Sequence, residues 1–274
     1  MTCSARQSGF ALIMVLWTLA LLTTIGVQLA SSGRREAQLT RNLMDSAVLQ
    51  AAADGAVQQA IFRLLDSSER QWRADGMFHL MRLGHSLVRV RIEDESGKVN
   101  PNIASAELLR ALLLEASTPP HLAPGLAAAI VAWRSAAGGP TARSTITAQY
   151  ASAGRDYRPP GAPFESIDEL GAVLGMTPEL LARLSPHMTI FTEEDPDAST
   201  TDPVVAAALA AVSNGTLAAG QPTGRSAVLV ARVTAVAQGP HGAVVAERVI
   251  VRTNALGGNR RYEILSREQG VSSF

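Results

Sequence analysis

The sequence predicts an α+β fold in which a long N-terminal helix packs on a small antiparallel sheet that carries a large inserted all-helical domain. Three observations lead to this prediction. An uncharged run begins at Gly9 and passes into an amphipathic helical pattern. Apolar and charged residues alternate around Val88, and two Val-rich segments follow beyond residue 226, which indicates strands. Helical patterns divided by Pro and Gly clusters lie between these strands.

The run from Gly9 to Ala30 is long and apolar enough to span a membrane. No Asp, Glu, Lys or Arg lies between Arg6 and Arg34. At about 1.5 Å per residue, a helix of this length matches the ~30 Å hydrocarbon layer of a bilayer. Two other interpretations stay open. One is a secretory signal peptide cleaved near Ala30, although its apolar core is usually ~7–15 residues long. The other is a buried helix of a soluble domain.

The helical pattern continues from Arg34 to Leu65 without a proline. An apolar stripe recurs there at helical spacing, interrupted by Gln50 and Asp54, and consists of Leu39, Leu43, Ala47, Val57, Ile61 and Leu64. Such a stripe predicts that this half of the helix faces another element. We therefore expect one continuous transmembrane and amphipathic helix over residues 10–66.

The junction between Gly9 and Phe10 resembles the leader of type IV pilins and type II secretion pseudopilins. Its sequence is Arg-Gln-Ser-Gly followed by Phe-Ala-Leu-Ile-Met. In such leaders a membrane peptidase cuts after the glycine and methylates the new N-terminal residue. The resemblance therefore implies a leader at residues 1–9 and the prepilin peptidase as a processing partner.

Met14 stands where most of these proteins carry a glutamate, at the fifth position of the mature chain. In the family, that glutamate lies in an apolar layer, where an unpaired charge is costly, and meets the N-terminal amine of a neighbouring subunit. A subunit without it lacks this pairing, as expected for one that stands first, at the tip. Among type II secretion pseudopilins, its absence is typical of the K-type minor subunit.

A motif after the strand around residue 88 resembles the K-type subunit more specifically. In that family a strand is followed by D-x-x-G-K-hydrophobic-N-x-N and then a helix, and Asp94, Gly97, Asn100 and Asn102 match this pattern. We expect these residues to be structural rather than catalytic. Gly97 permits a positive φ, and Asn102 or Ser105 can accept hydrogen bonds from the first amides of the next helix.

The region between the predicted strands contains several helix candidates. They span residues 104–116, 123–136, 166–174 and 177–184, separated by Pro and Gly clusters. Ser166 with Glu169 forms a capping-box pattern, and Thr177 with Pro178 forms an N-cap and first-turn pair. Residues 164–170, 174–177 and 184–190 also resemble the later part of the K-type insert.

The helix-Leu-Gly-Met-helix pattern around Gly175 also resembles a helix-hairpin-helix DNA-binding unit. Such a hairpin binds phosphates through backbone amides and nearby basic side chains, so its affinity depends on accumulated positive charge. Arg183 is the one basic residue here against Glu165, Asp168, Glu169 and Glu179. We expect no nucleic-acid partner and interpret the hairpin as a packing device. The alternative is a membrane-anchored DNA-binding protein of a DNA-uptake apparatus.

An acidic loop follows the helical region, with carboxylates at Glu193, Glu194, Asp195 and Asp197. Ca²⁺ prefers several oxygen ligands from a flexible loop, and members of the K-type family bind calcium. The spacing fits no EF-hand and offers no identifiable bidentate position. A solvated acidic linker is the favoured interpretation, and calcium is the candidate cofactor.

The C-terminal part predicts a helix at 204–212 and two strands at 227–236 and 243–253, joined as an antiparallel hairpin. The tail after residue 254 is either frayed or ends in a strand. The predicted division of the chain is a leader (1–9), a long helix (10–66), a strand region (67–103), an inserted helical domain (104–191), an acidic linker (192–203), a C-terminal helix with strands (204–254) and a tail (255–274).

The sequence shows no catalytic pattern, and we expect no enzyme. The 274 residues carry no net charge, which gives no bulk attraction to nucleic acid or anionic lipid. The single cysteine, Cys3, lies in the predicted leader. The histidines are scattered without ligand spacing, at His79, His85, His121, His187 and His241.

Together the resemblances imply a minor pseudopilin at the tip of the type II secretion pseudopilus, initiating or capping its assembly for the export of folded proteins. They imply the I-type and J-type minor pseudopilins and the inner membrane as partners. A positive-inside count slightly favours the opposite orientation, because Arg34 and Arg35 follow the span. The resemblance alone places the leader in the cytoplasm and the C-terminal domain in the periplasm, with a single membrane pass.

Overall fold

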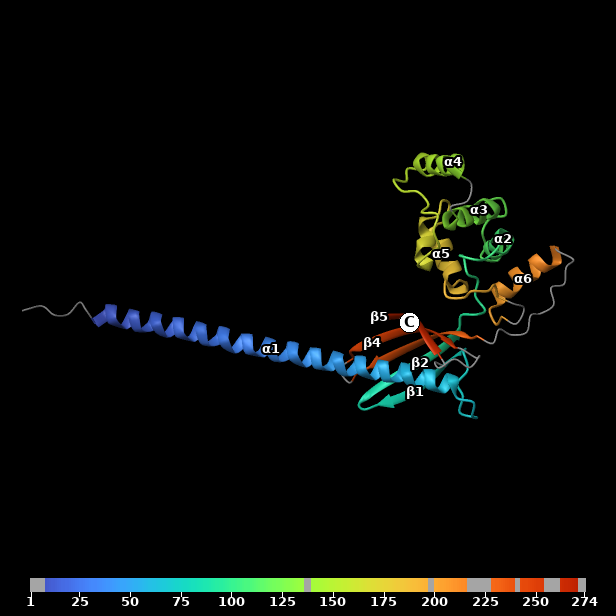
Figure 1. Ribbon diagram of the computed structural model, residues 1–274. Helices are drawn as coiled ribbons and strands as arrows, with labels where there is room; N and C mark the ends of the chain where they lie inside the picture. The colour runs from blue at the N-terminus through green and yellow to red at the C-terminus, as the bar shows by residue number, and fades with distance from the viewer. Residues whose placement is uncertain are drawn as a thin grey trace, which may run out of the picture.

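The computed structural model describes residues 8–135, 139–196, 200–215, 228–239, 242–253 and 262–270. A long helix, α1 (Ser8–Leu65), packs its second half on a five-stranded antiparallel sheet, and the other helices gather on the side of the sheet away from the free half of α1 (Figure 1). This is the predicted α+β fold class. The first seven residues of the predicted leader lie outside the described part.

Helix α1 runs uninterrupted for 58 residues, which is about 87 Å at 1.5 Å per residue. Its apolar half contains three threonines whose hydroxyls need no outside partner. Thr18, Thr23 and Thr24 each donate to a carbonyl of the preceding turn at 2.8 to 2.9 Å. Polar side chains that bond back to their own helix are compatible with an apolar environment.

The sheet covers α1 only from Leu49 onward. Half of the helix residues that face the sheet are alanines, which lets the backbones approach. The full set comprises Leu49, Ala52, Ala53, Ala56, Val57, Ala60, Ile61 and Leu64. The predicted apolar stripe is therefore right at its C-terminal end. It is wrong for Leu39 and Leu43, which are 62% and 71% exposed, and for Ala47. Helical spacing shows which side is apolar but not where the partner surface stops.

The sheet has the strand order β1-β2-β3-β4-β5, with every pair antiparallel. Its strands are β1 (Asp75–Leu83), β2 (Ser86–Asp94), β3 (Val230–Gln238), β4 (Val244–Thr253) and β5 (Tyr262–Gly270). The sequence predicted β2, β3 and β4. The tail was expected either to fray or to end in a strand, and β5 is that strand. Strand β1 was missed. Because β2 and β3 are neighbours, residues 95–229 are an insertion between two adjacent strands.

Alternating residues of the central strands face α1 and close the core between helix and sheet. Val88, Val90 and Ile92 of β2 are fully buried there, as are alternate residues of β3 and β4. Strand β1 was missed because it carries apolar residues on both faces and so lacks this alternation.

The inserted region has a hydrophobic core of its own, separate from the core between α1 and the sheet. Its elements are α2 (Ala106–Glu115), α3 (Ala123–Arg134), α4 (Gly139–Ser152), a 3₁₀ helix (Ile167–Ala172), α5 (Pro178–Leu184), a second 3₁₀ helix (Ser185–His187) and α6 (Pro203–Gly215). Leu109, Leu112, Ile130, Leu170 and Leu184 are buried at its centre.

Three features of this region differ from the sequence-based expectation. Helix α4 begins at Gly139 and Pro140, which were interpreted as a separator, because proline is tolerated in the first turn of a helix. Ser166 makes no side-chain cap, and Glu169 accepts instead from the amide of Glu165 at 3.2 Å. Helix α6, grouped with the C-terminal strands in the sequence, packs on α2 and contributes to the inserted core.

Two neighbouring residues of α1 offer a matched test of the helix–sheet core. Ile61 is 1% exposed and Phe62 is 65% exposed. We predict that Ile61→Ala lowers the free energy of unfolding by about 2–5 kcal/mol, because it leaves a cavity under the helix. Phe62→Ala should change it by less than about 1 kcal/mol. Urea denaturation of the full chain in detergent micelles measures both, and equal effects would contradict the packing.

Candidate functional site

The first half of α1 presents an apolar surface that no described part of the protein covers. Within the described chain one segment, Phe10–Val27, is long and apolar enough to cross a membrane, and none of it is buried. Phe10 and Gly9 lie at the beginning of this helix, and Met14 is exposed in its second turn. The predicted processing position is therefore followed directly by a surface that needs lipid or other apolar helices around it.

A second feature is the connecting segment, residues 94–104, through which the chain leaves the sheet and enters the inserted region. Glu95 lies fully buried at its beginning, and its Oε1 is 2.7 Å from Nζ of Lys98 and 3.0 Å from Nε of Arg232. A buried carboxylate is tolerated only with such partners. The amide of Val230 donates to Oγ of Ser96 at 3.0 Å. The exit from β2 and the return into β3 are thus bonded to each other.

Gly97 serves this segment in a way that the sequence did not predict. Its φ is not positive, contrary to the expectation. A Cβ at this position would lie 2.6 Å from Oγ1 of Thr200, and that hydroxyl donates to the carbonyl of Gly97 at 2.8 Å. Glycine is needed here because the chain before α6 crosses close to the backbone.

The two asparagines of the motif connect distant parts of the inserted region. Asn100 Nδ2 donates to the carbonyl of Thr192 at 2.6 Å. Asn102 pairs with the backbone of Phe164 in both directions, donating to its carbonyl at 3.0 Å and accepting from its amide at 2.7 Å. Ser105, rather than Asn102, caps α2 by accepting from the amide of Leu108 at 3.1 Å. These contacts give the motif a structural use.

Several residues at this junction were missed in the sequence. Arg134 donates from Nη2 to the carbonyl of Ala104 at 2.7 Å and from Nη1 to that of Pro101. Asp202 accepts from the amide of Val204 at 3.0 Å and lies 2.6 Å from Nδ1 of His187. The Asp-Pro pair before α6 is an N-cap and first-turn pattern and could have been found. Arg134 gave no local signal.

The acidic loop does not form a metal site in the described residues. Glu193, Glu194 and Asp195 are exposed, and Oε1 of Glu193 lies 3.0 Å from Nη1 of Arg252. Asp197 lies outside the described residues. Within the described ranges no group of three His, Cys, Asp or Glu side chains could hold a metal ion. Calcium binding remains a prediction.

The hairpin around Gly175 uses its apolar faces for packing. Gly175 adopts a φ of +90° at the turn, and Leu170 and Leu184 on either side are buried in the inserted core. Thr177 caps α5 as expected, accepting from the amide of Leu180 at 3.2 Å. The absence of a nucleic-acid partner stays a prediction.

An ion-pair cluster joins α1 to the sheet. Arg267 of β5 lies with Nη2 2.6 Å from Oδ1 of Asp54 on α1 and with Nε 2.6 Å from Oε1 of Glu247 on β4. Burial raises the pKa of Glu247 to about 7, and the adjacent Asp54 adds to that rise while Arg267 opposes it. A hydrogen bond from Glu247 is the main reason that the pKa of Asp54 is lowered. The carboxyl of Glu247 therefore keeps its proton to a higher pH than an ordinary glutamate does.

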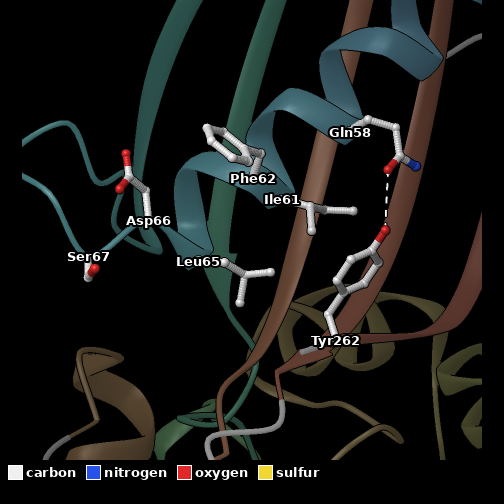
Figure 2. A pocket seen from close by; sticks show the side chains of 7 residues that line it. All are labelled: Gln58, Ile61, Phe62, Leu65, Asp66, Ser67 and Tyr262. Atoms are coloured by element: carbon white, nitrogen blue, oxygen red, sulfur yellow. Dashed lines mark hydrogen bonds between the residues drawn. The ribbon is translucent and has the colours of Figure 1, made fainter. Parts of the chain in front are cut away.

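A groove of about 400 Å³ opens between the end of α1 and the beginning of β5 (Figure 2). Ile61 and Leu65 form its apolar side, and the hydroxyl of Tyr262 donates to Oε1 of Gln58 at 3.4 Å across it. Phe62, Asp66 and Ser67 complete the lining. The lining of the groove thus combines apolar side chains with the Tyr262 hydroxyl and polar groups at its rim.

Comparison with known proteins finds a family model and a solved structure that are similar to this chain. Residues 76–193 match the family model described as type II secretion system (T2SS), protein K. That match covers β1, β2, the connecting segment and most of the inserted helices.

Over residues 76–193, the chain is thus similar to protein K of type II secretion systems.

The whole fold is also similar to a chain of "The Crystal Structure of the GspK-GspI-GspJ complex from enterotoxigenic Escherichia coli Type 2 Secretion System". The TM-score is 0.55 at 14% sequence identity, and the match covers 87% of this chain and 99% of that chain. A comparison with curated protein sequences finds no match. The match over residues 76–193 supports a minor pseudopilin of the protein K type, and the N-terminal apolar helix fits a transmembrane anchor.

Gly97→Ala tests the close approach between Gly97 and Thr200 in the connecting segment. We predict a loss of about 1–3 kcal/mol in the free energy of unfolding, because the new Cβ meets the Thr200 hydroxyl. Gly125→Ala in α3 is the matched control, since nothing lies within 4 Å of its Cβ position. That variant should be neutral or slightly more stable. Denaturant unfolding followed by tryptophan fluorescence compares the two, and an unaffected Gly97→Ala would refute the assignment.

Glu247→Gln tests the raised pKa of Glu247 in the ion-pair cluster. The unfolded carboxyl ionises near the ordinary glutamate pKa of 4.5, whereas the folded one has a pKa of about 7. Its contribution to stability is therefore fully present below pH 4.5 and is lost as the pH rises to 7. Relative to the Gln variant, the native chain should lose on the order of 2–3 kcal/mol across that interval. Parallel stability curves for both proteins would contradict the raised pKa.

Proposed function

We propose that this protein stands at the tip of the type II secretion pseudopilus, where it initiates or caps assembly for the export of folded proteins. One observation carries the proposal: α1 exposes an apolar segment at one end and holds a sheet with a large insertion at the other. Such a molecule inserts into a bundle of similar helices through one end only.

The position of the insertion supports a place at the tip. It leaves the sheet between β2 and β3 and gathers away from the free half of α1 (Figure 1). Neighbouring helices therefore have free access to the segment Phe10–Val27, whereas a subunit added ahead of this one would meet the inserted helices. A bulky end of this kind suits a first or last subunit.

Met14 supports the same place. A glutamate at this point of an apolar helix needs a cationic partner, because an unpaired buried charge is costly. Methionine needs none, so this subunit can be inserted without the amine of another subunit beside it. Met14 is exposed on the free half of α1, where such a partner would have to approach.

We further propose the I-type and J-type minor pseudopilins as partners. The structure of similar fold is titled as a complex of GspK with GspI and GspJ, which supports this choice. The proposal also places the apolar segment in the inner membrane and the folded part in the periplasm. Prepilin peptidase would cut between Gly9 and Phe10, at the beginning of the exposed segment.

Gly9→Ala is the direct test of this processing. We predict that the variant keeps its leader, migrates more slowly than the native chain on a denaturing gel, and fails to support secretion, because the peptidase requires the glycine. Gly26→Ala is the matched control inside the same segment, where nothing lies within 4 Å of its Cβ position. It should be trimmed normally. Normal trimming of Gly9→Ala would refute the proposal.

A further inference from the structure

The two edges of the sheet differ in a way that the proposed function does not explain. Edge strand β5 carries charged residues, including Glu263, Arg267 and Glu268. Edge strand β1 exposes large apolar residues instead: Met77 is 64% exposed, Phe78 51% and Leu80 67%. Proteins usually protect a free edge with charge, proline or a covering element, because its backbone can pair with another strand. Strand β5 has charged residues along its length, whereas residues 77–80 of β1 include no Asp, Glu, Lys or Arg.

Packing and strand pairing hold β1 in place at the edge of the sheet. Met81 and Leu83 pack against the core between α1 and the sheet, which holds β1 in position. Its pairing with β2 is regular from Phe78 to Leu83. The irregularity lies at the other end, between Asp75 and Phe78, where Nε of Arg91 donates to the carbonyl of Gly76 at 3.0 Å.

The outer face beside this edge is basic as well as apolar. Guanidinium carbons of Arg89 and Arg91 lie 5.4 and 5.5 Å from the ring centre of Phe78. Leu80 pairs across the strands with Arg89, and Arg82 with Leu87. Along β1 and β2, this face therefore alternates apolar and cationic side chains. The carboxylate of Glu93 lies near the other end and pairs with Arg91 at 3.1 Å.

A membrane surface fits this patch less well than a protein segment does. The predicted span ends near Val27, and the sheet first touches α1 at Leu49. Leu49 lies 22 positions beyond Val27 along the same helix, so the two are separated by about 33 Å. Lipid headgroups bound at the span would therefore lie well short of β1.

We propose that the free edge of β1 binds an extended segment of another protein, which adds a strand to the sheet and alternates apolar with acidic residues. Main-chain hydrogen bonds to β1 would supply affinity, as in other cases of strand addition. The carboxylates of the segment, all on one face of the added strand, would pair with Arg82 and Arg89, and their aliphatic stems would cover Phe78 and Leu80. The apolar residues would face the opposite side of the sheet, beside Met81. The inference is independent of the tip position, because it concerns a different surface from the exposed half of α1.

The test uses the full chain in detergent micelles and a labelled nine-residue peptide of alternating Val and Glu with blocked ends. Fluorescence anisotropy should show binding at least tenfold tighter than for a Val and Lys peptide or for a Val and Glu peptide with a central proline. Hydrogen exchange should slow in β1 and not in β5. Equal binding of the acidic and basic peptides would overturn the charge assignment.

Matched variants keep the test independent of folding. Leu80→Glu should weaken peptide binding at least tenfold, whereas Ile264→Glu on β5, at a position 40% exposed, should leave it unchanged. Both side chains are already exposed, and circular dichroism verifies the fold. Unchanged binding by Leu80→Glu, binding to anionic vesicles in place of the peptide, or self-association through β1 would each overturn the proposal. Failure here leaves the processing of Gly9→Ala unaffected, so the two proposals fail separately.

Discussion

The architecture depends on an apolar surface that the protein does not cover by itself. Large apolar side chains are exposed along α1 from Phe10 to Val27. Burial of each one is worth about 1.5–3 kcal/mol, so removing this segment from water outweighs the ~5–15 kcal/mol stability of a typical folded domain. This half of α1 therefore has to be surrounded by lipid or by other apolar helices. The sheet packs on the other half of α1 and fixes its orientation relative to the folded part.

Two separate hydrophobic cores stabilise the rest of the protein. Alanines on the second half of α1 allow close packing on the sheet, and Arg267 ties the helix to β4 and β5 through Asp54 and Glu247. The inserted helices have their own core and join the sheet through the connecting segment at residues 94–104.

Sequence patterns predicted what depends on local periodicity. The long helix and strands β2 to β4 follow from runs in which one face is consistently apolar. Strand β1 was not predicted because both of its faces carry apolar residues. The buried stripe of α1 begins at Leu49 because the sheet extends no further along the helix, which local periodicity does not reveal. The same limit applies to the junction, since Gly97 meets Thr200 across 103 positions of sequence and Arg267 meets Asp54 across 213. The motif drew attention to Gly97, but its close approach to Thr200 is visible only in three dimensions.

The mass of the N-terminal peptide, measured on protein purified from its native membranes, tests the account most directly. If the exposed half of α1 is the assembly segment of a minor pseudopilin, the mature chain begins at Phe10 and carries one methyl group on its amine. A chain that begins at Met1, or one cut near Ala30 as by signal peptidase, would contradict the account. In the second case the apolar half of α1 would be lost, and with it the surface on which the proposed assembly depends.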